Sequence, residues 1–430
     1  MKFNKINISE LLAGAMLVMS GSAMASGFAL VEQSGSGLGN AYAGGAASAE
    51  DASTIFYNPA GMSRLKGRQL VVGGSIITPS IKFSDAGSSP AALQTSNNGN
   101  GGDAGSSALV PNAYFSMQVD PKTHIGLGIN SPFGLQTEYG SNWIGRFQAM
   151  KSSIQTINLN PSISYDLNEQ VSLGAGLNYQ HITGELTSAV NYSALAGGAL
   201  GSNVAGVSSV SGSDSAWGYN LGALFNVDPQ TRLGVAYRSR IKYTLDGSVS
   251  FSNVPGPLAG AVQNGGVTLP ITMPDTLSIS GFHQLNDKWD MMADATWTGW
   301  SVLQQLQISR TSGATLQSVQ ENWKNTWRVA AGANYHYSDR WMARTGIAFD
   351  QSPVSDAYRT ARIPDSNRTW LSVGGQYKVS PASAVDLGYA HLFMSNASIN
   401  QNQMASGAGN LVGTYDNSVD IFSAQYTYSF

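Results

Sequence analysis

The chain has 430 residues, of which 23 are basic, 26 acidic, 49 glycine and none cysteine. Only 11% of the residues are charged, against about 25% in an ordinary soluble domain, so the composition argues against a typical cytosolic enzyme. A net charge of −3 without a Lys/Arg cluster leaves little to neutralise a phosphate backbone and argues against a nucleic-acid partner. The absence of cysteine excludes disulfides and thiolate metal sites.

Residues 1–25 have the features of a secretory signal. Lys2 and Lys5 precede an apolar stretch that ends at Met19, and Ala23-Met24-Ala25 supplies the small residues of a cleavage site. Beyond residue 25, no run approaches the roughly 18 to 20 apolar residues that a spanning helix needs. We predict export with cleavage after Ala25; the alternative is a short helix at the start of the mature chain.

Residues 26–66 do not alternate between apolar and polar side chains. They contain the Gly-rich run Ser34-Gly35-Ser36-Gly37-Leu38-Gly39, but no strand precedes it and no Lys-Ser/Thr pair follows it, so it does not indicate a phosphate loop. The strands that follow predict a barrel wide enough for something to fill its lumen. We therefore predict that residues 26–66 form a plug, or hatch.

Residues 67–430 repeat an apolar period of 2, which is typical of half-buried strands. From Trp327 to Tyr337, large apolar side chains alternate with Arg, Gly, Asn and His over eleven residues, the span of a tilted membrane strand. Trp289 and Trp297 bracket a short apolar band, as aromatic girdles do. A soluble β-sandwich also alternates, but here the second face carries Gly, Ser, Asn and Thr, as a wet lumen requires.

Connections of two very different lengths separate these strands. Long polar connections run over Ser84–Ser107 and Ser188–Ser215, and the last strand ends on the aromatic Phe430. Six tight turns occur at Asp120–Thr123, Asp166–Glu169, Asp228–Thr231, Asn286–Lys288, Ser338–Arg340 and Ser380–Ala382. This asymmetry is typical of bacterial outer-membrane barrels.

The turns also give a strand count. Six tight turns join twelve strands, and two more flank them, one beginning near Gln69 and one closing the chain. We predict an all-β fold, a transmembrane antiparallel β-barrel of about 14 strands over residues 67–430, with the N-terminal hatch in its lumen. An open edge would leave backbone groups unsatisfied in hydrocarbon, so the barrel must close. An even count places both termini on the periplasmic side, and the terminal aromatic strand predicts recognition by the outer-membrane assembly machinery.

Several motifs together resemble a known family, over essentially the whole mature chain. They are Ser26-Gly27-Phe28, Ser36 to Gly44, Asn58-Pro59-Ala60, Tyr237-Arg238-Ser239, Gly346 to Val354, and Ile363-Pro364-Asp365 with Arg368 and Trp370. The family is the FadL-type outer-membrane channels for long-chain fatty acids and other hydrophobic molecules. The resemblance implies a hatch signature at Asn58, Pro59 and Ala60, an apolar ligand pocket, and a kinked third strand that opens the wall sideways.

The sequence offers its own reason for that kink. The third strand begins at His124 and then meets Asn130-Ser131-Pro132-Phe133-Gly134. Pro132 cannot donate to the ladder and Gly134 favours a bulge, so strand pairing should fail there. We predict a lateral opening at Pro132 and Gly134; the alternative is that Pro132 simply ends the strand at the outer surface.

Ligand-binding roles follow mainly from the resemblance. Lys324 matches the family's pocket lysine, which would meet a buried carboxylate, and the alternative is a solvated loop lysine. The mature N-terminus, Ser26 and Phe28, is expected to reach the pocket, as are Ser131 and Phe133 beside the kink.

One departure bears on the ligand. The family's arginine after the fourth strand has no counterpart in Gln180–Ser188, so uncharged hydrocarbons stay possible.

Charged residues on the lumen faces are expected to pair with the hatch or with one another. They are Arg328, Arg344 and Asp350, with Asp294 and Asp386. The five histidines are scattered over different strands, so we predict neither a metal site nor a cofactor, and no motif indicates a catalytic residue.

The predicted function is a channel in the outer membrane of a Gram-negative bacterium for uptake of long-chain fatty acids or related hydrophobic compounds. Binding in an apolar lumen pocket would be followed by hatch rearrangement and lateral exit through the kinked strand. We expect a monomer in contact with outer-membrane lipid and lipopolysaccharide. The alternative is a general diffusion porin or a surface adhesin.

Overall fold

The computed structural model describes residues 27–94 and 99–430, so the predicted signal and Ser26 lie outside the described residues. The strands are β1 (Arg68–Asp85), β2 (Ala108–Gln118), β3 (Thr123–Asn130), β4 (Gly134–Glu138), β5 (Lys151–Asp166), β6 (Val171–Asn191), β7 (Ala205–Asn226), β8 (Thr231–Arg238), β9 (Ile241–Phe251), β10 (Gly265–Met273), β11 (Thr276–Asn286), β12 (Trp289–Thr298), β13 (Gln305–Arg310), β14 (Thr315–Gln320), β15 (Thr326–His336), β16 (Trp341–Asp350), β17 (Arg368–Ser380), β18 (Ser383–Met394), β19 (Ala397–Gln403) and β20 (Gly409–Ser429). The short helices are α2 (Gly35–Leu38), α3 (Gly45–Ser48), α4 (Thr54–Tyr57) and α5 (Tyr192–Leu195), with 3₁₀ turns η1 (Pro59–Arg64), η2 (Gly256–Leu258), η3 (Trp300–Val302) and η4 (Met404–Ser406).

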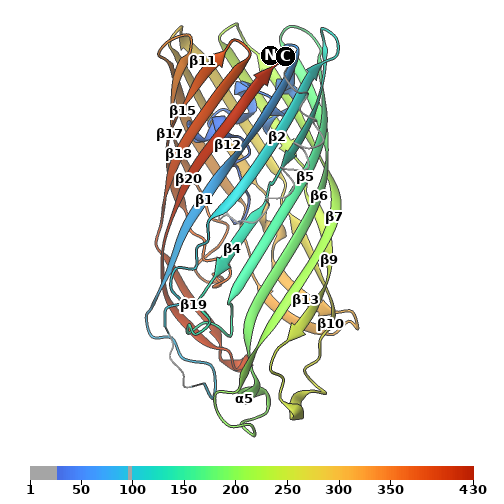
Figure 1. Ribbon diagram of the computed structural model, residues 1–430, viewed down its shortest axis with the longest axis vertical. Coiled ribbons are helices and arrows are strands. Elements are labelled where there is room, and N and C mark those ends of the chain that lie inside the picture. The colour runs from blue at the N-terminus through green and yellow to red at the C-terminus, as the bar shows by residue number, and fades with distance from the viewer. Residues whose placement is uncertain (1–26, 95–98) are drawn as a thin grey trace, which may run out of the picture.

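These segments form one closed antiparallel barrel with fourteen strand positions around its wall (Figure 1). Each position, here called a stave, is filled by one strand segment or by two consecutive segments. The pairs β3 and β4, β8 and β9, β10 and β11, and β18 and β19 follow one another along single staves, and β13 and β14 form a hairpin in the connection between β12 and β15. β1 closes the barrel because it pairs with β2 on one side and with β20 on the other, from Gln69 opposite Ser429 to Asp85 opposite Gly413. The predicted fold and strand count are confirmed.

The two faces of each stave differ as the sequence pattern predicts. On β15, Trp327 and Val329 are 48% and 47% exposed on the outer face, whereas Arg328 and Ala330 on the inner face are each 8% exposed. No helix within residues 27–94 and 99–430 is long and apolar enough to cross a bilayer.

The tight turns and the C-terminus lie at one end of the barrel, here called the short-turn end (Figure 1). The turns owe their shape to side-chain capping: the Asp120 carboxylate accepts from the backbone N–H of Lys122 and Thr123, and Asp228 does the same for Gln230 and Thr231. The opposite end, which carries α5, is the long-loop end.

One predicted loop is wrong. Residues 188–215 were expected to form a long connection, but β6 and β7 remain paired as far as Asn191 opposite Ala205, so only residues 192–204 connect them. The outer parts of these strands are rich in Gly and Ser on both faces, as expected where a stave leaves the apolar band and both faces meet water. The period of 2 therefore vanishes although the ladder continues.

The third stave breaks where the sequence predicts. Ladder pairing with β2 ends at Ala113 opposite Ile129, and β4 pairs only with β5. On the β5 side, Asn130 lies opposite Asn158 and Gly134 opposite Gln155, so three residues of the broken stave face two of β5. The backbone of Phe133 bonds instead to the Thr156 hydroxyl, which donates to its carbonyl and accepts from its N–H.

Residues 27–66 lie in the lumen, and their short helices lie toward the short-turn end (Figure 1). α2 contacts β17, β18 and β20, α3 contacts β8 and β11, and η1 contacts β5, β6 and β7, so the segment meets the wall on several sides. The division of the chain into hatch and barrel as functional units stays a prediction.

Inner-face glycines allow this close approach. A Cβ on Gly222 would overlap the side chain of Asn58, and a Cβ on Gly346 would overlap the backbone carbonyl of Asn40. Because Asn40 is held by backbone geometry, the clash at Gly346 cannot be relieved by a side-chain rotation.

A second feature of the segment is the fully buried Glu32. Neither carboxylate oxygen has a hydrogen-bond partner on another described residue. Burial raises the pKa of Glu32 to about 7, and the nearby Arg368 and Arg328 offset only part of this effect. Glu32 therefore favours its neutral form inside the barrel.

Gly346→Ala should destabilise the folded protein by about 1–3 kcal/mol, because the added methyl must displace the Asn40 backbone. The temperature at which the barrel unfolds, read from heat-modifiable electrophoretic mobility, should fall. Gly281→Ala is the matched control, since the nearest atom to its new methyl is Leu233 Cδ2 at 3.7 Å. Equal unfolding temperatures for the two variants would show that the segment is not held against β16.

Glu32→Gln should remove a pH dependence of stability. The folded protein holds the Glu32 proton up to about pH 7, whereas the unfolded chain releases it near the ordinary pKa of 4.5. Stability of the natural protein should therefore fall as pH rises from 4.5 to 7, by about 3 kcal/mol in total. Denaturant unfolding in detergent at pH 4.5 and 7.5 checks this, and parallel pH profiles for the two proteins would contradict it.

Candidate functional site

The beginning of the described chain pairs with the break in the third stave. The N–H of Leu30 donates to the Pro132 carbonyl at 2.8 Å, and the N–H of Gly134 donates to the Phe28 carbonyl at 2.9 Å. Ala29 and Phe133 are the bridge partners between these two bonds. The interrupted edge is thus occupied by a short strand from the chain itself.

The side chain of Gln33 also binds to the break in the third stave. Its amide nitrogen donates to the Ser131 carbonyl at 2.7 Å, and its amide oxygen accepts from the Ser131 N–H at 3.1 Å. The hydroxyl of Tyr114, from the neighbouring β2, donates to the Gln33 carbonyl at 2.7 Å. Ser131 therefore acts through its backbone at this point, while Pro132 contributes its carbonyl.

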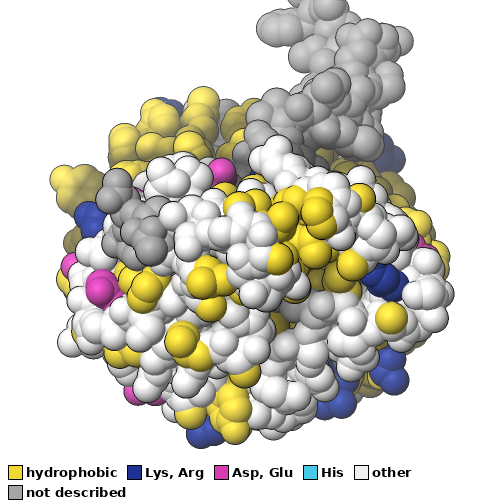
Figure 2. Space-filling view, turned by 90° about the horizontal axis from the view of Figure 1, so that it is seen from below, with side chains coloured by type: hydrophobic (Ala, Val, Ile, Leu, Met, Phe, Trp, Pro, Cys, Tyr) yellow, Lys and Arg dark blue, Asp and Glu magenta, His cyan; other side chains and the backbone are white. Residues whose placement is uncertain are grey.

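Aromatic side chains surround Phe28. Its ring centroid lies 4.8 Å from that of Trp300, 5.6 Å from Trp323 and 6.1 Å from Phe133, and edge or tilted packing prevails. Phe28, Trp300 and Trp323 are fully buried, and the apolar cluster continues toward the long-loop end through Tyr243 and other side chains. Figure 2 views that end, where apolar patches lie among mainly uncharged polar side chains.

Two cavities adjoin this cluster. The inner cavity, about 140 Å³, lies between residues 29–59 of the N-terminal segment and β7, β8, β11 and β12, and its lining includes the charged residues Arg238, Asp294, Arg328 and Asp350. The wall cavity, about 170 Å³, lies at the break, where it is lined by Leu109 to Pro111 of β2, by Ser131, Phe133 and Gly134, and by residues of β5 and β6. Leu30 and Phe133 line both cavities, so these two side chains form the partition between them.

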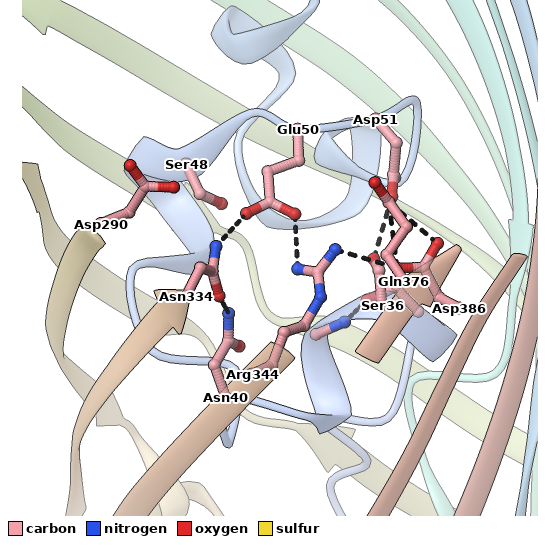
Figure 3. Close-up of polar contacts among 12 residues, drawn as sticks. Ser36, Asn40, Ser48, Glu50, Asp51, Asp290, Asn334, Arg344, Gln376 and Asp386 are labelled. Carbon is pink, nitrogen blue, oxygen red and sulfur yellow. Dashed lines mark hydrogen bonds and ion pairs between the residues drawn. The ribbon is translucent and has the colours of Figure 1, made fainter. Parts of the chain in front are cut away.

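Arg344 and Asp386, two of the charges expected on the lumen faces, lie inside the barrel and form an ion pair (Figure 3). Arg344 lies between Glu50 of the N-terminal segment and Asp386 of β18, and Nη2 is 2.9 Å from Asp386 Oδ1. Asn334 donates to the other oxygen of Glu50 at 2.9 Å. Burial alone would raise the pKa of Glu50, but the Arg344 guanidinium holds it below its ordinary value.

Arg328 and Asp350 complete this set. Arg328 donates to the Ala41 carbonyl at 2.6 Å and lies 3.6 Å from Asp294, and Asp350 lies 3.8 Å from Arg368. These ion pairs and hydrogen bonds connect one strand of the wall to another, or the wall to the N-terminal segment.

The hatch motif also holds the segment in place. Asn58 accepts from the Ala60 N–H through its side-chain oxygen, and its amide nitrogen donates to the carbonyls of Ala46 and Ala223. Pro59 begins η1, where a missing N–H costs nothing.

Lys324 lies elsewhere. It is exposed on the connection before β15 and lines neither cavity, so its role in ligand binding stays a prediction. Its neighbour Trp323 is the residue that reaches Phe28. Trp300 and Trp323 were not predicted as site residues, although the sequence places a tryptophan at each end of the polar connection between β12 and β15.

Within residues 27–94 and 99–430, no group of three or more His, Asp or Glu is arranged to hold a metal ion.

Comparisons with known proteins agree with this architecture. A family model described as Outer membrane protein transport protein (OMPP1/FadL/TodX) matches residues 16–430. The Long-chain fatty acid transport protein of Escherichia coli (strain K12) is 32% identical over 421 residues, covering 91% of this chain and 93% of that protein. Outer membrane protein P1 of Haemophilus influenzae is 36% identical over 423 residues, covering 91% and 90%.

Solved structures show the same barrel. The crystal structure of a Pseudomonas aeruginosa FadL homologue superposes with a TM-score of 0.87 at 27% identity, covering 94% of this chain and all of that one. The Ralstonia pickettii toluene transporter TbuX, at 21% identity and a TM-score of 0.67 over 93% of this chain and all of that one, shares the fold. The relatives whose names state a function are named for transport and not for an enzymatic activity. The chain therefore belongs to the OMPP1/FadL/TodX family of outer-membrane transport proteins of Gram-negative bacteria.

Proposed function

We propose that this protein takes up long-chain fatty acids or related hydrophobic compounds across the outer membrane. The observation that carries the proposal is the pair of cavities separated by Leu30 and Phe133 at the broken stave. One cavity faces the lumen and the other lies in the wall, so joining them would connect the interior to the bilayer. Relatives named for fatty-acid transport and for toluene transport support this class of ligand.

The binding step uses the apolar cluster around Phe28. A hydrophobic ligand that enters from the long-loop end replaces contacts among Phe28, Trp300 and Trp323 with contacts of its own. Phe133, and Ser131 beside it, then meet the ligand at the break, and the mature N-terminus at Ser26 follows Phe28. Lys324 on the nearby rim attracts an acidic headgroup during entry.

Release requires residues 27–33 to leave the break. They are held there by four hydrogen bonds between Phe28, Leu30 or Gln33 and residues 131–134, worth about 2–6 kcal/mol together. Ten buried methylenes of a ligand contribute about 8 kcal/mol, which is enough to displace them. The ligand then leaves sideways between Pro132, Gly134 and β2, as a monomeric barrel surrounded by lipid and lipopolysaccharide allows.

A general diffusion porin is the competing function. A porin would pass a large, steady ion current and would not support growth on a hydrophobic carbon source. We expect single-channel recordings of the purified protein to show no such current, and a deletion strain to recover growth on oleate only when complemented. A large open conductance together with unrestored growth would favour the porin.

Locking the N-terminal strand to the break should stop transport. Ala29 and Phe133 form a non-hydrogen-bonded antiparallel pair, for which Cα atoms lie about 4.5 Å apart, within the range of a disulfide. Because the chain has no cysteine, Ala29→Cys/Phe133→Cys introduces a single possible bridge. Oleate uptake by cells carrying the oxidised double variant should fall at least roughly tenfold and return on reduction.

The two single-cysteine variants are the controls for loss of the Phe133 ring. If the oxidised and reduced double variants transport oleate at the same rate, residues 27–33 do not gate the break.

A further inference from the structure

Arg238 is a cation in the lumen that lacks a carboxylate partner. It is the last residue of β8, it is half-buried, and its side chain lines the inner cavity. The guanidinium donates to the Phe56 carbonyl at 2.8 Å and to the side-chain oxygen of Asn178, and it lies over the Phe56 ring at 4.3 Å. Among the residues that the structure describes, it forms no ion pair with Asp or Glu.

Other arginines in the lumen either have a carboxylate partner or do not line the inner cavity. Arg328, Arg344 and Arg368 each lie within 4 Å of a carboxylate. Arg232, also on β8, pairs with none, but its donors are used by the Ala47 and Ser48 carbonyls and it does not line the inner cavity. Arg238 alone in this set combines an unneutralised charge with access to empty space.

Hydroxyl groups stand beside Arg238 on the same face. Thr276 of β11 lies directly opposite Arg238 in the ladder, and Thr298 of β12 lies opposite Thr276. Both threonines line the inner cavity. An oxyanion placed there could accept from the guanidinium and from these hydroxyls, while an attached apolar chain extends toward Leu30, Phe133 and Trp300 on the same cavity wall.

Buried asparagines hold Arg238 in position. Asn178 accepts from Arg238, and its own amide donates to Asn220 at 3.0 Å. Asn158 donates to Asn178 at 2.9 Å and to Asn130 at 3.1 Å. This chain of side-chain amides runs from Asn130, the last residue before the break, to the guanidinium, so hydrogen bonds connect the cation to the break.

We infer that Arg238, with Thr276 and Thr298, is a carboxylate-binding site for the headgroup of an acidic ligand inside the barrel. A half-buried cation without a counter-ion is only partly solvated, and a carboxylate can accept two hydrogen bonds from its guanidinium. The inference rests on the proposed function. It assigns the internal headgroup site to β8, at a place remote in sequence from Lys324, and it explains how an acid could bind although Gln180–Ser188 carries no arginine.

The test compares an acid with its neutral ester. Binding of radiolabelled oleate and methyl oleate to the purified, detergent-solubilised protein is measured by equilibrium dialysis for the natural chain, Arg238→Gln, Arg238→Lys, Arg232→Gln and Lys324→Gln. Arg238→Gln should lose roughly tenfold to hundredfold in oleate affinity and keep its ester affinity. Arg238→Lys should recover most of the oleate affinity, and Arg232→Gln should leave the acid-to-ester ratio unchanged.

Folding is checked for every variant by heat-modifiable mobility. If Arg238→Gln does not fold, Thr276→Val provides the second test, and its oleate affinity should fall about threefold to tenfold while the ester is unaffected.

Several outcomes would overturn the inference. Equal losses for acid and ester would show that Arg238 only supports the N-terminal segment, and a loss of the acid preference confined to Lys324→Gln would place the headgroup at the rim. If the natural chain binds the two ligands equally, a hydrophobic channel remains but the carboxylate site does not. Binding of neither ligand would reject both the site and the proposed function.

Discussion

Backbone hydrogen bonding in a medium without water is the constraint on which this structure depends. A barrel spans hydrocarbon only because every stave pairs with its neighbours, and a single proline in the third stave removes one donor from that closed ladder. The break at residues 131–133 leaves an edge that must find partners elsewhere. The N-terminal segment supplies them by pairing as a short strand. The same backbone groups that complete the wall are therefore the ones that a moving segment would release.

Charged and polar groups on the inner face of the barrel also need partners, and these partners are distributed unevenly along the barrel. Toward the short-turn end, Arg344, Glu50 and Asp386 form buried ion pairs, and inner-face glycines let residues 35–64 pack directly on the staves. Breaking one member of a buried pair costs about 3–5 kcal/mol, because the remaining charge is left without a partner. Toward the break, the contacts of Phe28 and Leu30 are neutral. The Gly27 N–H does donate to Asp365 at 2.9 Å, but this is a single bond at the end of the segment.

Local properties of the sequence predicted most of the fold. The period of 2, the Asp- and Asn-led turns and the proline in the third stave each act over a few residues, so strand number, closure and the position of the break could be predicted. The predicted length of the β6–β7 loop was wrong. Apolar and polar side chains alternate only where one face of a strand meets lipid, so the alternation stops where both faces meet water, although the β6–β7 ladder continues to Asn191.

The binding region was less predictable, since it joins residues far apart in the chain. Phe28 meets Trp300 and Trp323 only after the barrel has closed, and no local pattern marks Gly346 as the contact of Asn40. Lys324 was selected by resemblance of position, yet it lies exposed while the neighbouring tryptophan points inward. Arg238 was noticed within a motif, but its missing counter-ion is a property of the folded lumen.

In the proposed mechanism, this uneven distribution of contacts decides which part of the N-terminal segment moves. An apolar ligand exerts no differential effect on buried ion pairs, so it cannot loosen residues anchored by Glu50. It can replace aromatic packing around Phe28, because it offers the same kind of contact. In the mechanism proposed above, ligand binding acts on residues 27–33, the portion of the segment that covers the break. On this proposal, coupling between occupancy of the interior and opening of the wall needs no long-range change of the barrel, since the residues that the ligand displaces are the residues that cover the break.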